Sequence, residues 1–119
     1  MDRLVEITFI GEALEIYNKL NEVVNKQKID GKNNSDEMQL LKSIKTKIDF
    51  IKLNPFYGNQ IKKIIIPKEY SVDNLWRVEL IGFYRMLYTI DGNNIKIVCF
   101  ILDLVDHDKY NKKFGYRNK

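Results

Sequence analysis

Three consecutive apolar segments near the C-terminal end restrict the fold more than any other feature of this chain. Residues 75–80 alternate apolar and charged side chains, residues 83–90 are rich in Tyr, Phe and β-branched residues, and residues 95–105 are almost uninterruptedly apolar. Each pattern is typical of a β-strand. The sequence DGNN at residues 91–94 favours a tight turn, because Gly and Asn tolerate positive φ. These segments predict a three-stranded antiparallel meander with Arg85 in its middle strand.

The residues before the meander predict one strand and two helices. Alternating apolar residues at 5–9 indicate a short strand, whereas residues 12–29 and 35–53 carry apolar side chains at helical spacing. Asn34 or Ser35 is expected to cap the second helix. Because a short loop joins the helices, they should form an antiparallel hairpin packed on the sheet. The expected core stripes are Ala13, Tyr17, Leu20 and Val24 in the first helix, and Leu40, Leu41, Ile44, Ile48 and Ile51 in the second.

The remaining segments are shorter and less regular. Pro55 should end the second helix, since proline disfavours helix in the residue before it. Residues 61–66 predict a short strand and residues 67–73 a loop. Residues 106–113 predict a short helix capped by Asp106. A chain of 119 residues accommodates all of this in one domain, residues 1–119.

Composition limits the classes of protein to consider. The chain is 45% hydrophobic and 30% charged, which is typical of a globular protein. No apolar run is long enough to span a membrane and the N-terminus lacks a signal-peptide pattern, so we expect a cytoplasmic protein without a membrane partner. Cys99 should be a buried, inert thiol, since a nucleophile would need a neighbour such as His107, the only histidine. One cysteine and one histidine argue against a structural zinc site, and no metal or cofactor is expected.

The net charge of +4 is distributed unevenly along the chain. Residues 1–41 are acidic, whereas residues 42–68 contain seven lysines and one aspartate. The basic part suits an anionic partner such as nucleic acid, and Lys62 and Lys63 are candidate phosphate contacts. The alternative is a solvated lysine-rich surface without a specific partner.

The order of these elements resembles the RelE/ParE superfamily of toxins from prokaryotic type II toxin–antitoxin modules. The resemblance covers nearly the whole chain and rests on the order and spacing of short motifs. These are NPFYG at 54–58, LWRVEL at 75–80, YRMLY at 84–88, and LVDH at 104–107 followed by Tyr110 and FGY at 114–116. The last of them is most similar to archaeal members.

The resemblance implies an α+β fold, with a helical hairpin against a mostly antiparallel twisted sheet. It also implies an endoribonuclease that cleaves mRNA on translating ribosomes without a metal, by attack of a 2′-hydroxyl on the adjacent phosphate. The implied partners are the ribosome, mRNA and an antitoxin whose C-terminal segment wraps the toxin. Oligomers are expected to form mainly through that antitoxin.

Individual residues match the family pattern only in part. Arg85 matches the sheet arginine of the family's YR motif, and Arg77 matches a basic position on the preceding strand. Glu79 stands where the family has a second basic residue, and Asp108 where it often has an arginine. By spacing, the family's catalytic C-terminal tyrosine falls near Phe114, so that Tyr110 or Tyr116 would have to replace it.

The chemistry requires a base for the 2′ proton, a cation for the charge on the phosphorane and an acid for the leaving oxygen. Arg85 and Arg77 are the best cations, because a guanidinium grips two phosphate oxygens. His107 is the candidate acid or base, since an unperturbed histidine titrates near neutrality. The predicted catalytic residues are Arg85, Arg77, His107, Lys109 and Tyr116. The predicted RNA-binding residues are Lys62, Lys63, Tyr110, Lys112, Lys113 and Arg117.

Each assignment has a purely structural alternative. Arg77 and Glu79 should share one face of their strand and therefore pair with each other. A buried Arg85 would need a carboxylate such as Asp103. His107 would be a helix-cap residue bonded to backbone. Trp76 is expected in the core.

Two other functions stay open at the level of sequence. The acidic residues at 79 and 108 favour a non-nucleolytic protein, either a ParE-like gyrase poison or an inactive member that only binds antitoxin. An RNA-binding domain without toxicity is a third possibility.

Overall fold

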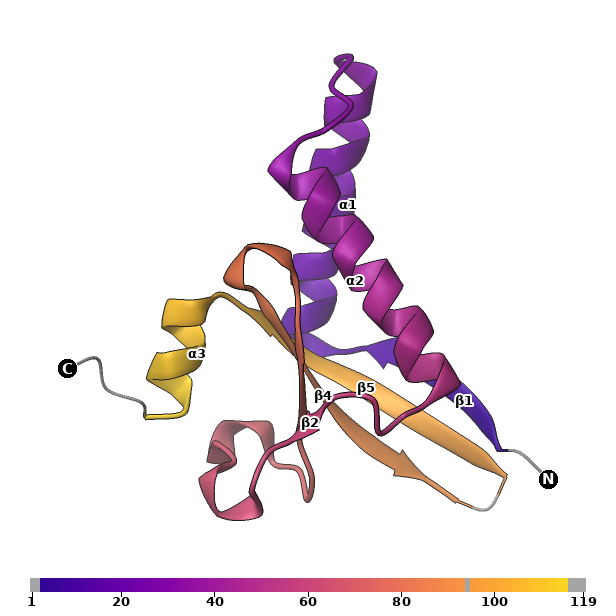
Figure 1. Ribbon diagram of the computed structural model, residues 1–119, viewed down its shortest axis with the longest axis vertical. Helices are drawn as coiled ribbons and strands as arrows, with labels where there is room; N and C mark the ends of the chain where they lie inside the picture. The colour runs from indigo at the N-terminus through magenta and orange to yellow at the C-terminus, as the bar shows by residue number, and fades with distance from the viewer. Residues whose placement is uncertain (1–2, 94, 116–119) are drawn as a thin grey trace.

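The computed structural model describes residues 3–93 and 95–115 as an α+β fold (Figure 1). Its five strands form one sheet in the order β1-β5-β4-β3-β2, in which β1 is parallel to β5 and all other neighbours are antiparallel. The strands are β1 (Leu4–Phe9), β2 (Asn59–Gln60), β3 (Trp76–Glu79), β4 (Arg85–Gly92) and β5 (Lys96–Val105). The helices are α1 (Gly11–Ile29), α2 (Asp36–Leu53) and α3 (His107–Lys113), with short 3-10 turns η1 (Lys63–Ile65), η2 (Lys68–Tyr70) and η3 (Ile81–Phe83).

The predicted meander is confirmed as β3, β4 and β5. One irregularity interrupts the pairing of β4 with β5, because Leu87 pairs with Asp103 whereas Tyr88 pairs with Ile101. The extra residue, Leu102, allows Leu102 and Asp103 to face the same side of the sheet as α3. Such a bulge re-aims side chains that strict alternation would separate.

The predicted helical hairpin is confirmed and covers one face of the sheet. Ser35, one of the two expected caps, accepts a hydrogen bond from the Met38 backbone N–H at 3.0 Å. The hairpin projects beyond the sheet, with the loop between the helices at its far end (Figure 1). None of the described helices is long and apolar enough to cross a membrane. The core on this face contains Ala13, Leu20, Val24, Leu41, Ile44, Ile51, Val78, Leu80, Met86, Tyr88, Ile97, Cys99, Ile101 and Leu104.

A second, smaller core lies on the opposite face, under α3 and the segment that leads into β3. Asp106 caps α3 as expected, accepting from the Lys109 backbone N–H at 2.8 Å. Tyr110 and Phe114 turn their rings from α3 into this core and stack at 4.3 Å between centroids. The cluster contains Ile61, Leu75, Leu87, Val105, Tyr110 and Phe114.

The strand predicted at residues 61–66 was wrong. β2 ends at Gln60, and the chain turns away through η1 after the Ile61 N–H bonds to the Leu75 carbonyl at 2.9 Å. Ile61 is buried, but Ile64 is 90% exposed. The β-branched composition predicted a strand, although beyond Ile61 the sheet offers this segment no pairing partner. The predicted loop at 67–73 contains the short turn η2.

The NPFYG motif forms a turn held by one buried tyrosine. The Tyr88 hydroxyl donates to the Pro55 carbonyl at 2.7 Å and accepts from the Gly58 N–H at 3.0 Å. A Cβ at Gly58 would lie 2.9 Å from the Arg77 carbonyl oxygen, so only glycine permits this close approach to β3. Burial raises the pKa of Tyr88 to about 12, so the hydroxyl remains a donor throughout the neutral range.

Two residues of α2 test the assignment of its buried face. Ile51 is fully buried and Leu53, two residues later, is 84% exposed. We expect Ile51→Ala to lower the free energy of unfolding by about 2–5 kcal/mol, because it leaves a cavity. Leu53→Ala should change it by less than about 0.5 kcal/mol. Urea denaturation checks both values, and equal effects would contradict the packing.

Cys99 is fully buried in β5, and burial raises the pKa of its thiol to about 11. The folded protein should therefore resist thiol reagents at pH 8, because the thiol is both protonated and inaccessible. The same protein in urea should react fully. A time course with a chromogenic disulfide reagent measures both rates, and rapid reaction in native buffer would contradict burial.

Candidate functional site

Three charged side chains meet where β3 ends and β4 begins. Glu79 and Arg85 are directly opposite each other in the antiparallel pair, and Arg77 lies two residues before Glu79. Strand alternation sends these side chains to the face opposite the helical hairpin, since Val78 between them belongs to the core under α1 and α2. The expected shared face of Arg77 and Glu79 is confirmed.

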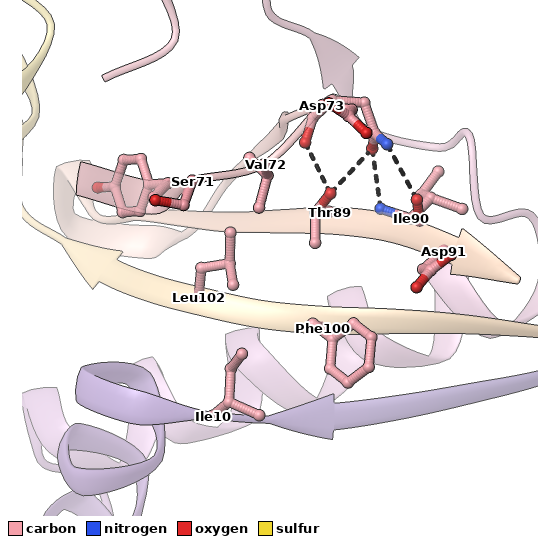
Figure 2. Close-up of a pocket in the computed structure, with 11 residues that line it drawn as sticks. Ile10, Ser71, Val72, Asp73, Thr89, Ile90, Asp91, Phe100 and Leu102 are labelled. Atoms are coloured by element: carbon pink, nitrogen blue, oxygen red, sulfur yellow. Dashed lines mark hydrogen bonds between the residues drawn. The ribbon is translucent and has the colours of Figure 1, made fainter. Parts of the chain in front are cut away.

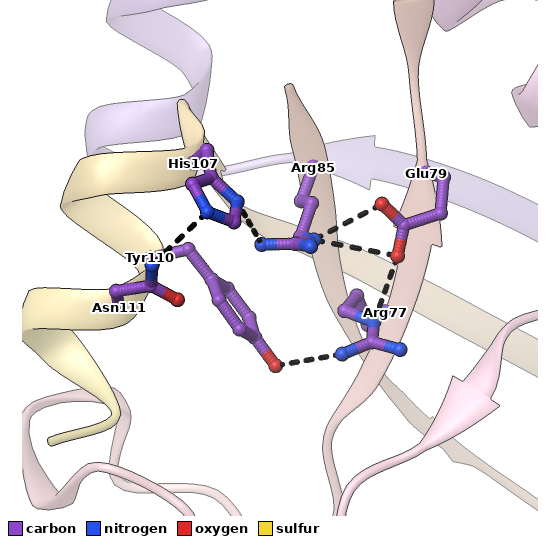
Figure 3. A network of polar contacts seen from close by, with 6 residues as sticks. All are labelled: Arg77, Glu79, Arg85, His107, Tyr110 and Asn111. Atoms are coloured by element: carbon purple, nitrogen blue, oxygen red, sulfur yellow. Dashed lines mark hydrogen bonds and ion pairs between the residues drawn. The ribbon is translucent and has the colours of Figure 1, made fainter. Parts of the chain in front are cut away.

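The Glu79 carboxylate bridges both guanidinium groups (Figure 3). Arg85 Nε donates to its two oxygens at 3.0 and 3.3 Å, and Arg77 Nε lies 3.1 Å from Glu79 Oε1. The arginines are therefore held close together in spite of their like charge. We call the set Arg77, Glu79, Arg85 and His107 the arginine cluster.

Tyr110 of α3 contacts both arginines of the cluster from the side of the smaller core. Its ring centroid lies 4.4 Å from the Arg85 guanidinium carbon and 5.6 Å from that of Arg77, within cation–π range. Its hydroxyl accepts a hydrogen bond from Arg77 Nη1 at 3.1 Å. Tyr110 is only 1% exposed, so the RNA contact predicted for it would require the ring to leave the core. In this arrangement it orients the two guanidinium groups.

His107 is the first residue of α3 and contacts Arg85 from the side away from Glu79 (Figure 3). Its Nδ1 lies 3.4 Å from Arg85 Nη1, and its Nε2 lies 3.2 Å from the side-chain amide of Asn111. Because the guanidinium can only donate, Nδ1 must accept, and a neutral ring then carries its proton on Nε2. The Asn111 atom that lies 3.2 Å from Nε2 is the amide nitrogen Nδ2, which is also a donor, so this contact is a hydrogen bond only when Nε2 carries no proton or when the amide is turned over. His107 thus bonds side chains rather than backbone, and the helix cap is Asp106.

The cluster is open to solvent on one side. The side chain of Arg85 is 18% exposed, that of Arg77 29% and that of Glu79 51%. The guanidinium groups are thus the more buried part of this surface, and the Glu79 carboxylate is the part nearest the solvent. A partly desolvated guanidinium attracts an anion more strongly than one in bulk water, because the local dielectric constant is lower.

The carboxylate that pairs with Arg85 is Glu79 and not Asp103, which the sequence suggests as one possible partner. The bulge in β5 aims Asp103 at α3 and η2, where its carboxylate accepts from the Tyr70 hydroxyl at 2.8 Å and lies 3.5 Å from Lys113 Nζ. Lys113 also bonds Glu69 at 2.7 Å. Partial burial opposes the charge of Lys113, but the hydrogen bond to Glu69 and the charge of Asp103 prevail and raise its pKa. Burial and the bond to Asp103 likewise raise the pKa of Tyr70. This network fixes α3, which carries His107 and Tyr110.

The other predicted site residues lie apart from the arginine cluster or have another partner. Lys109 extends toward α1, with Nζ 3.8 Å from Glu12. Lys113 belongs to the Asp103 network. Lys62, Lys63 and Lys112 are exposed. Tyr116 and Arg117 lie outside the described residues. Phe114, near which the family's tyrosine falls, is buried against Tyr110.

Sequence reasoning missed three residues at this site. Glu79 appeared as a partner of Arg77 alone, although its position opposite Arg85 follows once the turn between the strands is known. Asn111 is one helical turn after His107, which is a recognisable spacing. Phe83 is 80% exposed and its ring meets the His107 ring edge to face, with centroids 6.4 Å apart. Nothing in the sequence distinguished it from a strand residue.

A separate hollow of about 420 Å³ lies on the same face of the sheet, beside residues 70–74 (Figure 2). Its floor is apolar, from Ile10, Phe100 and Leu102, and Asp73 and Asp91 supply carboxylates at one end. The Asn74 amide on its wall is already bonded to Thr89 and Ile90. The carboxylates of Asp73 and Asp91 make this hollow unfavourable for a phosphate. Within residues 3–93 and 95–115, no group of three or more His, Cys, Asp or Glu side chains could hold a metal ion.

Comparisons with known proteins identify the fold. No protein-family model matches the chain, and no curated protein matches it. Among solved structures, the fold is similar to that of a YoeB/ParE toxin from Agrobacterium tumefaciens, with a TM-score of 0.58. The match covers 86% of this chain and 98% of that chain, at 12% sequence identity. The RelE/ParE-type fold expected from the sequence motifs is thereby confirmed.

The Asp103 network should determine how firmly α3 is held. Asp103→Asn removes the buried charge that faces Lys113, so we expect a loss of about 1–3 kcal/mol of unfolding free energy. Hydrogen exchange in residues 107–113 should rise more than in β4. The same substitution at exposed Asp49 of α2 is the control and should leave both quantities unchanged. Unaltered exchange in α3 would contradict the positioning role.

Proposed function

We propose that this chain is the toxin of a type II toxin–antitoxin module and acts as an endoribonuclease on mRNA in translating ribosomes. The observation that carries the proposal is the arginine cluster, in which two guanidinium groups share an open surface with one carboxylate and one imidazole. The fold shared with a YoeB/ParE toxin supports the toxin assignment.

Phosphate binding is assigned to Arg85 and Arg77. A phosphate that enters the cluster competes with Glu79, which is more exposed than either arginine, for the guanidinium N–H groups. It also lies between Arg85 and His107, where it accepts from both if His107 is protonated. This exchange replaces a 3.4 Å contact by two charge-assisted hydrogen bonds. Tyr110 and its core neighbours hold the guanidinium groups in place, so little reorganisation is needed.

Glu79 and His107 are assigned as base and acid. They contact the Arg85 guanidinium from opposite sides (Figure 3). Glu79 accepts the proton of the 2′-hydroxyl, whose oxygen attacks the adjacent phosphorus. The bond from phosphorus to the 5′-oxygen breaks, and imidazolium His107 protonates that oxygen. The products are a 2′,3′-cyclic phosphate and a 5′-hydroxyl, with Arg85 and Arg77 stabilising the phosphorane.

The bridging position of Glu79 also supports a second candidate function. A carboxylate that neutralises part of the arginine charge weakens the attraction for RNA. If the remaining positive charge is too weak to bind RNA, the protein is a ParE-like gyrase poison or a family member that only binds antitoxin. Inhibition of gyrase supercoiling without RNA cleavage would select this alternative.

An antitoxin is the proposed protein partner, in a cytoplasmic setting. The end of α2 and the turn after it expose large apolar side chains, with Leu53 84%, Phe56 55%, Phe50 41% and Tyr57 41% exposed. An apolar patch of this kind is typical of a protein interaction site.

The cleavage assay uses purified protein and ribosomes programmed with a defined mRNA. Wild type should produce fragments with 2′,3′-cyclic phosphate ends. Arg85→Ala should slow cleavage by about 10²–10³-fold, as loss of a single transition-state donor does. Lys45→Ala removes an exposed positive charge from α2 and should cleave at the wild-type rate. Intact mRNA with the wild-type protein would refute the ribonuclease.

Glu79→Gln separates the two roles of this carboxylate. If Glu79 is the base, the variant should bind RNA more tightly, because a negative charge is gone, and yet cleave about 10²–10⁴-fold more slowly. Filter binding and single-turnover cleavage measure the two effects. Faster cleavage by the variant would mean that Glu79 only obstructs the phosphate site.

A further inference from the structure

We propose that Phe83 is a stacking platform for a nucleobase of single-stranded RNA, next to the phosphate bound at Arg85; this inference rests on the proposed function. Phe83 lies at the end of η3, two residues before Arg85, and is 80% exposed. Its ring meets His107 edge to face, with an interplanar angle of 62°. A single T-shaped contact covers at most one face of the Phe83 ring, and with the residue 80% exposed a face remains available for stacking.

The exposure of Phe83 is maintained against two opposing tendencies. A phenyl ring gains free energy when it leaves water. The backbone of Phe83 has φ of 64°, the left-handed region that non-glycine residues rarely adopt. A strained, solvent-facing aromatic is unfavourable for stability by both measures, and such features concentrate at binding sites.

The surrounding structure holds the loop in this conformation. The Leu80 N–H bonds the Tyr84 carbonyl at 2.8 Å and closes the turn. The Ile81 N–H donates to Ser43 Oγ of α2 at 3.1 Å, which ties the turn to the helical hairpin. Gly82 supplies a second positive φ, of 71°. Tyr84 turns the other way and lines a hollow beside α2, so the two neighbouring aromatics point to different sides of the loop.

The neighbours of Phe83 indicate what it would bind. Arg85 and Arg77, with Glu79 between them, offer guanidinium groups to a phosphate, and an exposed ring beside them suits the base attached to the same backbone. Base–aromatic stacking is tolerant of sequence and adds to the electrostatic term. A purely apolar partner would offer no further acceptor to the guanidinium groups that Glu79 bridges, whereas a phosphate would, which favours RNA over a hydrophobic peptide.

A double-mutant cycle, in which Phe83 is substituted in the protein and single bases are removed from the RNA, tests the proposal. The probe is a short single-stranded RNA with a 2′-deoxy substitution at the scissile position, which prevents cleavage, and versions of it with one abasic site at each position. Phe83→Leu keeps an apolar side chain but removes the ring, and should weaken binding by about 5- to 150-fold. One abasic position should weaken wild type to a similar extent and leave Phe83→Leu unaffected. Phe83→Trp should bind as wild type does, with its fluorescence quenched by the RNA.

Equal affinity of wild type and Phe83→Leu would overturn the proposal, as would an abasic penalty that is the same in both proteins. Loss of antitoxin binding in Phe83→Leu with unchanged RNA affinity would overturn it in favour of a protein contact. The ribonuclease assignment is judged separately by Arg85-dependent cleavage on ribosomes. If the abasic penalty depends on Phe83 but no cleavage is found, the stacking site stands and the ribonuclease is rejected. If Arg85-dependent cleavage is found but the abasic penalty does not depend on Phe83, the ribonuclease stands and the stacking site is rejected.

Stability provides a second, independent readout. Phe83→Gly relieves the positive φ and removes an exposed apolar ring, so this variant should unfold at a higher urea concentration than wild type. It should nevertheless bind the RNA more weakly. If Phe83→Gly is less stable than wild type and binds the RNA with equal affinity, the proposal that the exposed ring serves a ligand is overturned.

Discussion

The position of one buried ring, that of Tyr110, determines the geometry of the arginine cluster. Its ring lies under both guanidinium groups and its hydroxyl bonds Arg77. The ring is in turn held by Phe114 and the small core beneath α3. The two guanidinium groups can stay adjacent because the Glu79 carboxylate bridges them and the electron-rich face of the Tyr110 ring lies against them. Everything that the site does depends on α3 being docked.

The two faces of the sheet serve different purposes. One face is covered by the α1–α2 hairpin and holds most of the buried apolar residues. The other is covered only in part, by α3 and residues 61–75, and the arginine cluster lies at the edge of this smaller core. Strand alternation explains how residues as close as Val78 and Glu79 belong to different layers. A rigid layer behind a partly open one holds the charged side chains in place and leaves them accessible from solvent.

Much of this structure could be predicted from periodicity, and the failures have physical causes. The meander, the hairpin and the caps at Ser35 and Asp106 follow from local patterns. The strand predicted at 61–66 failed because a strand needs a neighbour to pair with, which composition does not report. The Asp103 contacts depend on a bulge that shifts one residue, and a sequence does not reveal register. Phe83 escaped notice because φ is a property of the folded turn. The arginines were identifiable, but their bridging by Glu79 required the strand pairing.

The parallel pairing of β1 with β5 has a consequence for how the protein matures. Leu4 of β1 pairs with Lys96 of β5, so the sheet cannot close before the helices and strands between them have been made. Pairings so distant in sequence form slowly, because loop-closure entropy must be overcome first. Since α3 directly follows β5, its histidine and tyrosine join the site only after β5 has paired. A chain in which α3 is not yet docked therefore lacks both the imidazole beside Arg85 and the ring beneath the two guanidinium groups.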